Sequence, residues 1–179
     1  MNYNSIAISG LPGTGKGTLN KLLAKELGWA SYSVGDHWRE KHKQDPEKSH
    51  LSFSVYWRQA SVEENKRIDM EIAEKVAHGG IVVDGRYIHI FQPETFKVFI
   101  TASLDVRVSR VPDYKRPGQT DSEVEETLKQ REANEVAMGK LLYGEDYDYR
   151  DRKHYNLFLD TVGMSPQDEL QIVLKAMKG

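Results

Sequence analysis

The 179-residue chain contains no cysteine, and none of its apolar runs is long enough to cross a bilayer. The first absence excludes a disulfide framework and thiolate zinc sites. The second excludes a membrane-spanning helix, and the amino terminus lacks the basic start and long apolar stretch of a signal peptide. We therefore expect a cytoplasmic protein without a membrane partner.

The chain also lacks a large excess of positive or negative charge. The chain has 25 Lys and Arg residues against 27 Asp and Glu residues, which leaves a net charge of -2 at pH 7. This balance gives no reason to expect a nucleic-acid partner, and any site for an anion must be local. The length and an ordinary composition favour a single domain over residues 1–179, which we expect to be monomeric.

Short apolar stretches alternate with segments of helical period along the chain. This alternation is typical of crossover units on a parallel sheet, and it predicts an α/β fold of three layers with a five-stranded parallel sheet. Two polar, proline-containing stretches, residues 43–60 and 111–121, interrupt it and are expected to be excursions from the sheet. The expected strands are residues 6–9, 30–33, 81–84, 96–101 and 157–160.

Two helix starts have clear capping patterns. Ser61 with Glu64 has the spacing of a capping box. Ser165 before Pro166, with Asp168 in the first turn, predicts the start of the last helix.

The most specific motif lies between the first expected strand and the next helix, and it reads Gly-Leu-Pro-Gly-Thr-Gly-Lys-Gly-Thr over residues 10–18. Glycines let backbone N–H groups turn inward around an anion, and the helix N-terminus adds positive potential. Lys16 adds a mobile charge for the β- and γ-phosphates. The motif predicts a P-loop NTPase fold. The expected phosphate-binding residues are Gly10, Gly13, Thr14, Gly15, Lys16, Gly17 and Thr18.

Two residues are candidates for holding magnesium. The general phosphate-loop pattern has Ser or Thr directly after the lysine, whereas this chain has Gly17 there and Thr18 one place later. We expect Thr18 to take over part of that role. Asp84 ends an expected strand beside the loop, where a hydrated Mg²⁺ needs an anion, so we assign it to magnesium, directly or through water.

The phosphate loop resembles that of nucleoside monophosphate kinases, adenylate and cytidylate kinases in particular. Residues 33–39, Ser-Val-Gly-Asp-His-Trp-Arg, are similar to the segment after the second strand of that superfamily. The triplet Asp-Gly-Arg at 84–86 resembles cytidylate kinases, because adenylate kinases have a longer Asp-Gly-x-Pro-Arg there. Residues 92–103 and 159–166 resemble further cytidylate-kinase segments, and residues 53–76 resemble the short archaeal type.

The resemblance implies ATP as phosphoryl donor with Mg²⁺, and CMP or dCMP as acceptor. It implies a short segment for the monophosphate at about residues 36–67 and a short lid at about residues 111–131. Arginine forks suit the phosphate that must be held in line, and lid closure excludes water. The expected acceptor-binding residues are Ser33, Asp36, Arg39, Arg86 and Glu135, and the expected catalytic residues are Lys16, Arg110 and Arg131, with Lys115 and Arg116 in the lid.

One position departs from the family pattern. Cytidylate kinases usually carry Arg-Asp-x-x-Asp-x-x-Arg on the helix after the lid, and this chain has Met138 in place of the last arginine. Glu135 can still meet a ribose hydroxyl or an amino group, but Met138 cannot donate to a pyrimidine carbonyl, and Lys140 is a candidate to replace it. Two alternatives stay open. One is a preference for AMP, since the phosphate loop resembles that of adenylate kinases equally well, and the other is a nucleotide-binding regulatory protein without transfer, since phosphate loops serve many functions.

Two further groups of residues are expected to be structural. Residues 143–155, rich in Tyr, Asp and Arg, are expected to form a solvated loop with partly packed rings. In the bacterial relatives nucleotide-contacting elements occupy this neighbourhood, so the resemblance leaves Arg150 and Arg152 open as nucleotide contacts without an assigned role. The three tryptophans are expected to pack in the core or at a hinge rather than stack on a base. These are Trp29, Trp38 and Trp57.

Overall fold

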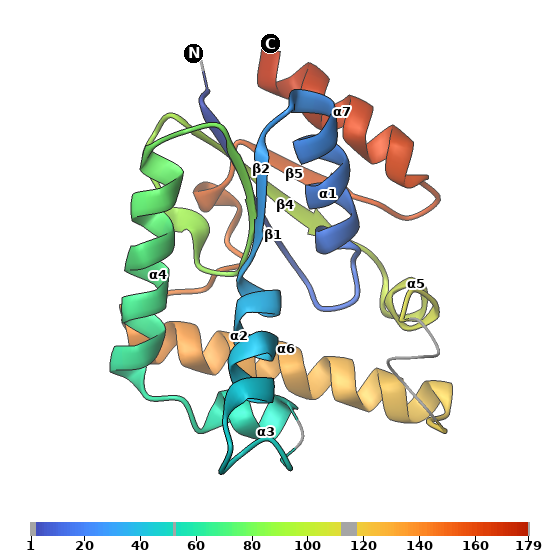
Figure 1. Cartoon of the computed structure of the whole chain (residues 1–179). Coiled ribbons are helices and arrows are strands. Elements are labelled where there is room, and N and C mark those ends of the chain that lie inside the picture. The colour runs from blue at the N-terminus through green and yellow to red at the C-terminus, as the bar shows by residue number, and fades with distance from the viewer. Residues whose placement is uncertain (1–2, 52, 112–117, 179) are drawn as a thin grey trace.

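The fold is a parallel sheet flanked by helices, seen in a computed structural model that describes residues 3–51, 53–111 and 118–178 (Figure 1). The strand order is β2-β3-β1-β4-β5 and every pairing is parallel. Each strand lies within one residue of its predicted bounds, so the predicted α/β fold is confirmed. The strands are β1 (Ser5–Gly10), β2 (Ala30–Ser33), β3 (Ile81–Asp84), β4 (Thr95–Thr101) and β5 (Leu157–Asp160).

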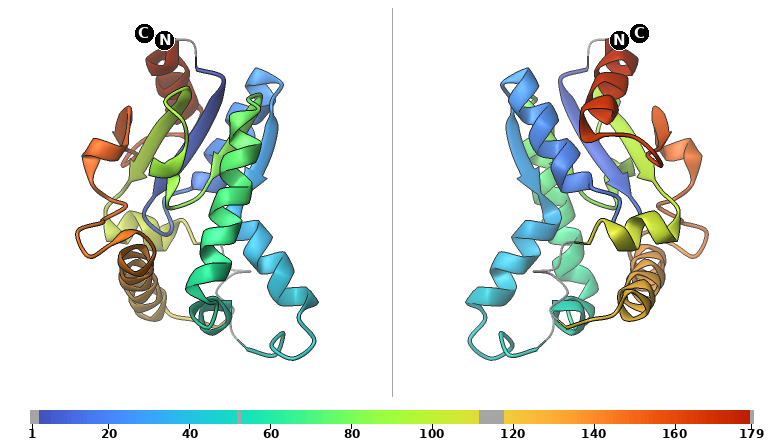
Figure 2. Two further views of the ribbon diagram at one scale, coloured as in Figure 1. Left: turned by 90° about the vertical axis from the view of Figure 1, so that its left-hand side faces the viewer. Right: turned by 90° about the vertical axis from the view of Figure 1, so that its right-hand side faces the viewer.

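The helices cover both faces of the sheet and one of its ends. In Figures 1 and 2, α1 and α7 lie on one face and α4 on the other, while α2, α3 and α6 gather beyond the carboxyl ends of the strands. No helix in the described part of the chain is both long and apolar enough to span a membrane. The helices are α1 (Lys16–Leu27), α2 (Val34–Gln44), α3 (Phe53–Arg58), α4 (Val62–Ala77), α5 (Leu104–Ser109), α6 (Asp121–Tyr143) and α7 (Pro166–Lys178), with short 3-10 turns η1 (Ile88–Ile90) and η3 (Arg152–His154).

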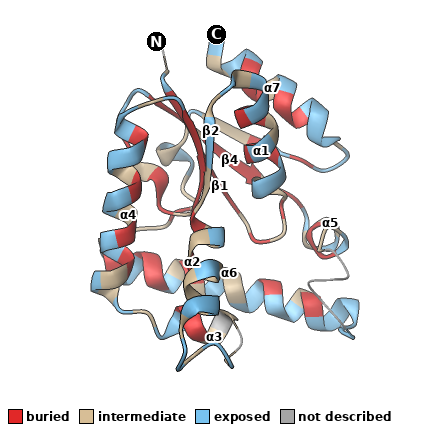
Figure 3. Cartoon of the chain, viewed as in Figure 1, coloured by how far each residue is buried: buried red, intermediate tan, exposed pale blue. Residues whose placement is uncertain are grey.

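Alternating side chains of the strands supply two separate cores. In β1, Ile6 and Ile8 pack with α1 and α7, whereas Ala7 faces α4 and α6. Period-two alternation explains this division, because a strand in a parallel sheet is buried on both faces. Figure 3 shows the result as a continuous buried band along the central strands, with exposed residues on the outer sides of the helices.

The helix starts follow the sequence with one difference. The Ser61 hydroxyl accepts a hydrogen bond from the Glu64 N–H at 3.0 Å, as predicted. The Glu64 carboxylate, however, pairs with Lys41 of α2, so the capping residue also ties α4 to α2. At α7 the predicted cap is reciprocal, since the Ser165 N–H donates to Asp168 at 3.0 Å and the Ser165 hydroxyl accepts from the Asp168 N–H at 3.2 Å.

We predict that Gly10→Ala destabilises the fold by about 2 kcal/mol, the usual scale of overpacking. The reason is that a Cβ at the end of β1 would overlap the backbone carbonyl oxygen of Ile100 in β4. Gly17→Ala is the matched control, because a Cβ there meets nothing nearer than Asp84 at 4.0 Å. In a helix, alanine is favoured over glycine by about 0.5–1 kcal/mol. Urea unfolding of both variants tests the claim, and equal stabilities would contradict it.

Candidate functional site

The turn between β1 and α1 has the geometry of an anion cradle. Gly13 and Gly15 take left-handed φ values of 85° and 93°. Residues with a side chain rarely adopt these values. Gly15 caps α1 without any side-chain hydrogen bond. The first N–H groups of a helix have no intrahelical acceptor, so they and the positive end of the helix dipole are available to a phosphate.

Lys16 lies across this loop. Its Nζ donates to the carbonyl oxygens of Gly10 and Leu11 at 2.8 and 2.9 Å. Burial lowers the pKa of Lys16 to about 7, an effect that the carboxylate of Glu135 opposes and the guanidinium of Arg131 reinforces. The ammonium therefore responds to groups on α6 as well as to the loop.

Asp84 stands at the carboxyl end of β3, where hydrogen bonds fix both of its oxygens. Asn20 Nδ2 donates to Oδ2 and Ser33 Oγ donates to Oδ1, each at 3.0 Å. Burial raises the pKa of the Asp84 carboxyl, while the nearby Lys16 ammonium favours its ionised form. Ser33 also caps α2 by accepting from the Asp36 N–H at 3.3 Å. One hydroxyl thus orients both the carboxylate and the helix.

Glu135 of α6 is the central carboxylate of the site. Its side chain is 1% exposed, and Oε1 lies 2.6 Å from Arg86 Nε and 2.9 Å from Arg131 Nε. The Tyr149 hydroxyl donates to Oε2 at 3.2 Å. Burial alone disfavours ionisation, but the two guanidiniums outweigh it and lower the pKa of Glu135. One buried anion thus holds two arginines side by side.

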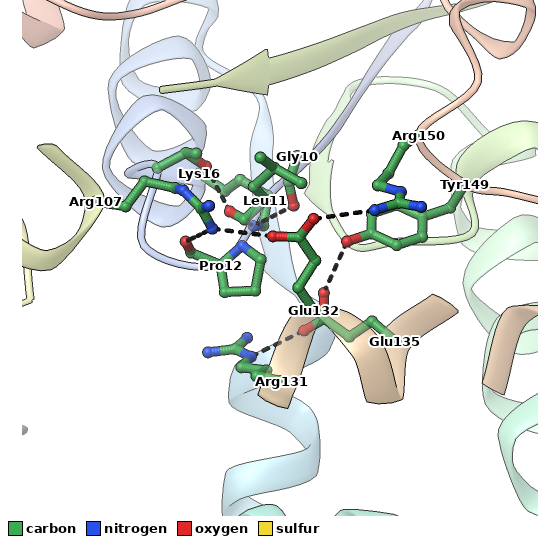
Figure 4. A network of polar contacts seen from close by, with 11 residues as sticks. Gly10, Leu11, Pro12, Lys16, Arg107, Arg131, Glu132, Glu135, Tyr149 and Arg150 are labelled. Carbon is green, nitrogen blue, oxygen red and sulfur yellow. Dashed lines mark hydrogen bonds and ion pairs between the residues drawn. The ribbon is translucent and has the colours of Figure 1, made fainter. Parts of the chain in front are cut away.

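A second set of ion pairs anchors the phosphate loop to α6 (Figure 4). Arg107 Nη1 donates to the Pro12 carbonyl at 3.3 Å and to Glu132 at 3.2 Å. Arg150 Nη1 donates to the other oxygen of Glu132 at 3.0 Å. The loop position therefore depends on α6 through Arg107 and Glu132, one turn of helix before Glu135.

Two aromatic rings of α3 support two of the predicted acceptor arginines. The guanidinium of Arg86 lies 4.9 Å from the centre of the Trp57 ring, and that of Arg39 lies 5.7 Å from the centre of the Phe53 ring. An aromatic face attracts a cation at such a distance. Asp36 pairs with Arg39 at 2.6 Å. Both guanidiniums are thereby oriented by an aromatic face on one side and a carboxylate on another.

Two cavities are each lined by some of the predicted residues. A cavity of about 300 Å³ between α3 and α6 is lined by Arg86 and Arg131 together with Phe53 and Trp57. A second cavity, of about 450 Å³, is lined by Gly17, Asn20, Ser33, Asp36 and Asp84 among others. The first collects arginines and the second collects carboxylates beside the phosphate loop.

Comparison with known proteins gives the family. A model of the cytidylate kinase-like family matches residues 5–162. The chain belongs to the cytidylate kinase-like family. A cytidylate kinase from Methanopyrus kandleri is 32% identical over 96% of this chain and 91% of its own length, and one from Archaeoglobus fulgidus is 32% identical over 97% and 94%. The chain is accordingly a nucleoside monophosphate kinase, as the sequence predicted.

Solved structures are similar at the level of the fold. An uncharacterized protein from Eubacterium ventriosum superposes with a TM-score of 0.72 at 16% identity, over 99% of both chains. A shikimate kinase from Acinetobacter baumannii, solved with shikimate, has a TM-score of 0.63 at 17% identity, over 98% of this chain and 93% of its own. These likenesses confirm the P-loop kinase fold of this member of the cytidylate kinase-like family.

The predicted site residues of this kinase fall into three places. Arg86, Arg131 and Glu135 converge electrostatically on Lys16, since each of them shifts its pKa. Arg110 lies elsewhere: its Nη1 donates to the Thr14 carbonyl at 3.1 Å and to the Thr161 hydroxyl at 2.7 Å, on the α7 side of the loop. The third group consists of Ser33 at the end of β2 and of Asp36 and Arg39 in α2. The roles of all three groups in nucleotide binding stay predictions.

Other predictions for the lid and α6 have separate outcomes. Lys115 and Arg116, with the prolines on either side of them, lie outside the described residues. Met138 is 9% exposed and packs in the core. Lys140 is exposed and is not part of the lining of the 300 Å³ cavity. The structure therefore gives no support to Lys140 as a replacement for the missing arginine.

Several residues of the site carry no motif and were missed from the sequence. Asn20 is 1% exposed and joins Asp84 to β2 through the Tyr32 carbonyl and the Ser31 hydroxyl. Trp57 packs as predicted, but it also lines the cavity and supports Arg86. A signal for Asn20 existed, because a polar residue on the apolar face of a predicted helix needs buried partners.

The expectation of a solvated loop with partly packed rings at residues 143–155 is only partly correct, since residues 144–146 are exposed and Tyr143, Tyr147 and Tyr155 are partly buried. Tyr149 is fully buried and Tyr155 donates to its carbonyl. Tyr143 donates to Asp69 of α4 at 2.6 Å, and Tyr147 bonds His89 at 2.7 Å. Tyr149 is part of the core between α4, α6 and the sheet, the other three rings pack against that core, and the hydroxyls of all four have hydrogen-bond partners.

The donor set around Asp84 fits magnesium. Oxygen ligands suit this ion, which commonly keeps several waters and takes one or two carboxylates together with substrate phosphates. Hydrogen bonds hold the Asp84 carboxylate in place, and its Oδ2 lies 4.0 Å from the position that a Cβ at Gly17 would occupy. Gly17 is in the first turn of α1, the helix that also carries Lys16. Thr18 is exposed on the same helix, and its part in metal binding stays a prediction.

We predict that Glu135→Gln lowers the free energy of unfolding by about 3 kcal/mol at pH 7, because it leaves Arg86 buried without its anion. The matched control is Glu125→Gln on the exposed side of α6, which breaks the pair with Lys129. It should change the same free energy by less than about 0.5 kcal/mol. Urea unfolding at pH 7 measures both effects, and equal losses in the two variants would contradict the assignment.

The sign of the pH dependence follows from the lowered pKa of Glu135. Its stabilising charge is present above the ordinary value of 4.5 and is lost as the pH falls through the lowered pKa. The difference in stability between the unaltered protein and Glu135→Gln should therefore shrink toward acid pH.

Proposed function

We propose that this kinase transfers the γ-phosphoryl group of ATP to CMP or dCMP, with Mg²⁺ as the metal. A phosphate oxygen of the acceptor forms a bond to the γ-phosphorus as the bond to the β-phosphate oxygen breaks, which yields ADP and the nucleoside diphosphate. The acceptor oxygen is already anionic at neutral pH, so no general base is needed. The protein contributes position and positive charge.

The observation that carries the proposal is the paired arginines beside the phosphate loop. Arg86 and Arg131 share Glu135 and line one cavity, and both act electrostatically on Lys16. A protein that binds only ATP has no use for a second group of phosphate-binding arginines. A lysine of the phosphate loop that is electrostatically coupled to a separate pair of arginines supports a reaction between two phosphorylated ligands.

Each residue then has a distinct task. Backbone N–H groups of the loop and Lys16 hold the β- and γ-phosphates, and Asp84 holds the metal. Arg86, with Arg39 from α2, holds the acceptor phosphate in line, while Arg131 faces the charge that spreads over the transferring group. Bound magnesium would neutralise phosphate charge and orient the β- and γ-oxygens.

Arg110 has a supporting task in this proposal. Its guanidinium joins the Thr14 carbonyl of the phosphate loop to Thr161 after β5, which fixes the loop against the sheet. It reaches transferring phosphates only if it exchanges these bonds when the lid closes. Its catalytic role, expected from the family resemblance, therefore stays a prediction.

Acceptor-dependent ADP release from ATP and Mg²⁺ tests the proposed function. A panel of CMP, dCMP, UMP, AMP and GMP, with a reaction lacking acceptor, should give the highest rate with CMP or dCMP. Arg86→Ala tests the site assignment. It should lower kcat/KM for the acceptor about 100-fold and leave the affinity for ATP nearly unchanged, because it holds a reacting group.

Other results of the panel would overturn the proposal. The highest rate with AMP would move the acceptor preference to that of adenylate kinases. ADP release that does not depend on any acceptor, or no release at all with ATP bound, would indicate a nucleotide-binding protein without transfer.

We also predict that ATP affinity falls as the pH rises through 7. Only the ammonium form of Lys16 pairs with phosphate, and its pKa in the ligand-free protein is about 7. The apparent Kd for ATP with Mg²⁺ should therefore rise about tenfold from about pH 6 to about pH 8. Lys16→Arg is the matched control, since its guanidinium stays charged over this range. Calorimetric titration measures both proteins, and an equal pH dependence in both would show that another group titrates.

A further inference from the structure

The cavity that holds Arg86 and Arg131 also presents two amide side chains, and these bear on which acceptor it takes. Gln130 and Asn134 lie four residues apart on α6 and line the cavity with Arg131 between them in sequence. Residues at this spacing share one helix face. The pair therefore stands within reach of a ligand whose phosphate is held by the arginines, as the proposed function requires.

The two amides are already ordered by one another. Gln130 Nε2 donates to Asn134 Oδ1 at 3.1 Å. This bond leaves the Gln130 carbonyl oxygen as an acceptor and the Asn134 amino group as a donor, and among the described residues neither has a further hydrogen-bond partner. A neighbouring acceptor and donor in fixed order form a pattern that recognises a complementary edge.

Cytosine carries that complementary edge. Its exocyclic amino group is a donor next to the ring nitrogen N3, which is an acceptor. Uracil has the reverse order, a carbonyl oxygen next to an N–H, and it would set its carbonyl against that of Gln130. Side-chain amides read the equivalent donor and acceptor pair of adenine in the same two-bond manner.

We infer that Gln130 and Asn134 read the base of the acceptor, the Gln130 carbonyl accepting from the exocyclic amino group and the Asn134 amino group donating to the ring nitrogen. This inference rests on the proposed function. The two residues that select the base then lie one to two turns of α6 before Met138, which is packed in the core. The aromatic rings of Phe53 and Trp57 line the same cavity from α3, and Gln130 is exposed at its edge on α6.

The decisive variant is Asn134→Asp, which replaces the donor by an acceptor of nearly the same shape. The ratio of kcat/KM for CMP to that for UMP should fall about tenfold or more, mainly through loss with CMP. Gln130→Leu removes the carbonyl and should lower the same ratio about tenfold. Ala133→Asp is the matched control, because it adds the same charge at an exposed neighbouring position of α6 and should leave the ratio unchanged.

Two readouts separate this inference from a general loss of structure or of function. The KM for ATP and the unfolding temperature should stay near those of the unaltered protein in all three variants. An unchanged CMP to UMP ratio in Asn134→Asp and Gln130→Leu, in a protein that phosphorylates CMP, would overturn the inference alone. A preference of the unaltered protein for UMP would also overturn it.

Failure of the proposed function looks different. If no monophosphate were phosphorylated, the proposed function itself would fall. If AMP were the best acceptor, the same variants would be compared on AMP and IMP, whose edges differ in the same way, and an unchanged ratio there would overturn the role of the amide pair.

Discussion

The ion pairs of Glu135 are the interaction on which the rest of the site depends. One carboxylate, buried on α6, fixes a guanidinium from the loop after β3 and a second from its own helix, and it favours the charged form of Lys16. Two arginines repel each other unless an anion lies between them. Because this anion is buried and bonded to both guanidiniums, it holds them in fixed positions, which is the preorganisation that the proposed phosphate binding calls for.

Positive charge in this kinase is therefore local. The chain as a whole carries a charge of -2, yet the loop amides, Lys16, Arg86 and Arg131 face one region at the carboxyl ends of the strands. Open α/β sheets bind ligands at this edge because helix N-termini and strand-end loops meet there. The aromatic rings of α3 restrict two of the arginines further, so the segment between α2 and α4 helps to shape the site even though it contributes no helix to either face of the sheet within the described residues.

Much of the fold could be predicted because its signals are local. Short apolar runs bounded by polar residues located every strand within one residue, and the caps at Ser61 and Ser165 lie at the predicted helix starts. The full burial of Tyr149 could not be predicted in this way. Tyr149 looks like a polar loop residue in sequence, and it is buried because β4, α4 and α6 leave a space that large rings fill. Asn20 likewise looks like an ordinary helix residue until β2 and β3 bring Ser31 and Asp84 against it.

The sequence by itself determined the phosphate loop, the strand that ends in Asp84 and the membership of a kinase family, because each depends on residues adjacent in the chain. The tertiary structure decided which charged residues act together. Glu135 lies far along the chain from Arg86, and the residues around each of them do not indicate that the two form an ion pair. The ion pair forms because α6 packs across the carboxyl ends of the strands. The same packing turned Gln130 and Asn134 toward the arginine cavity and Met138 into the core. Long-range contacts of this kind arise from how helices pack, and packing is a property of the whole chain.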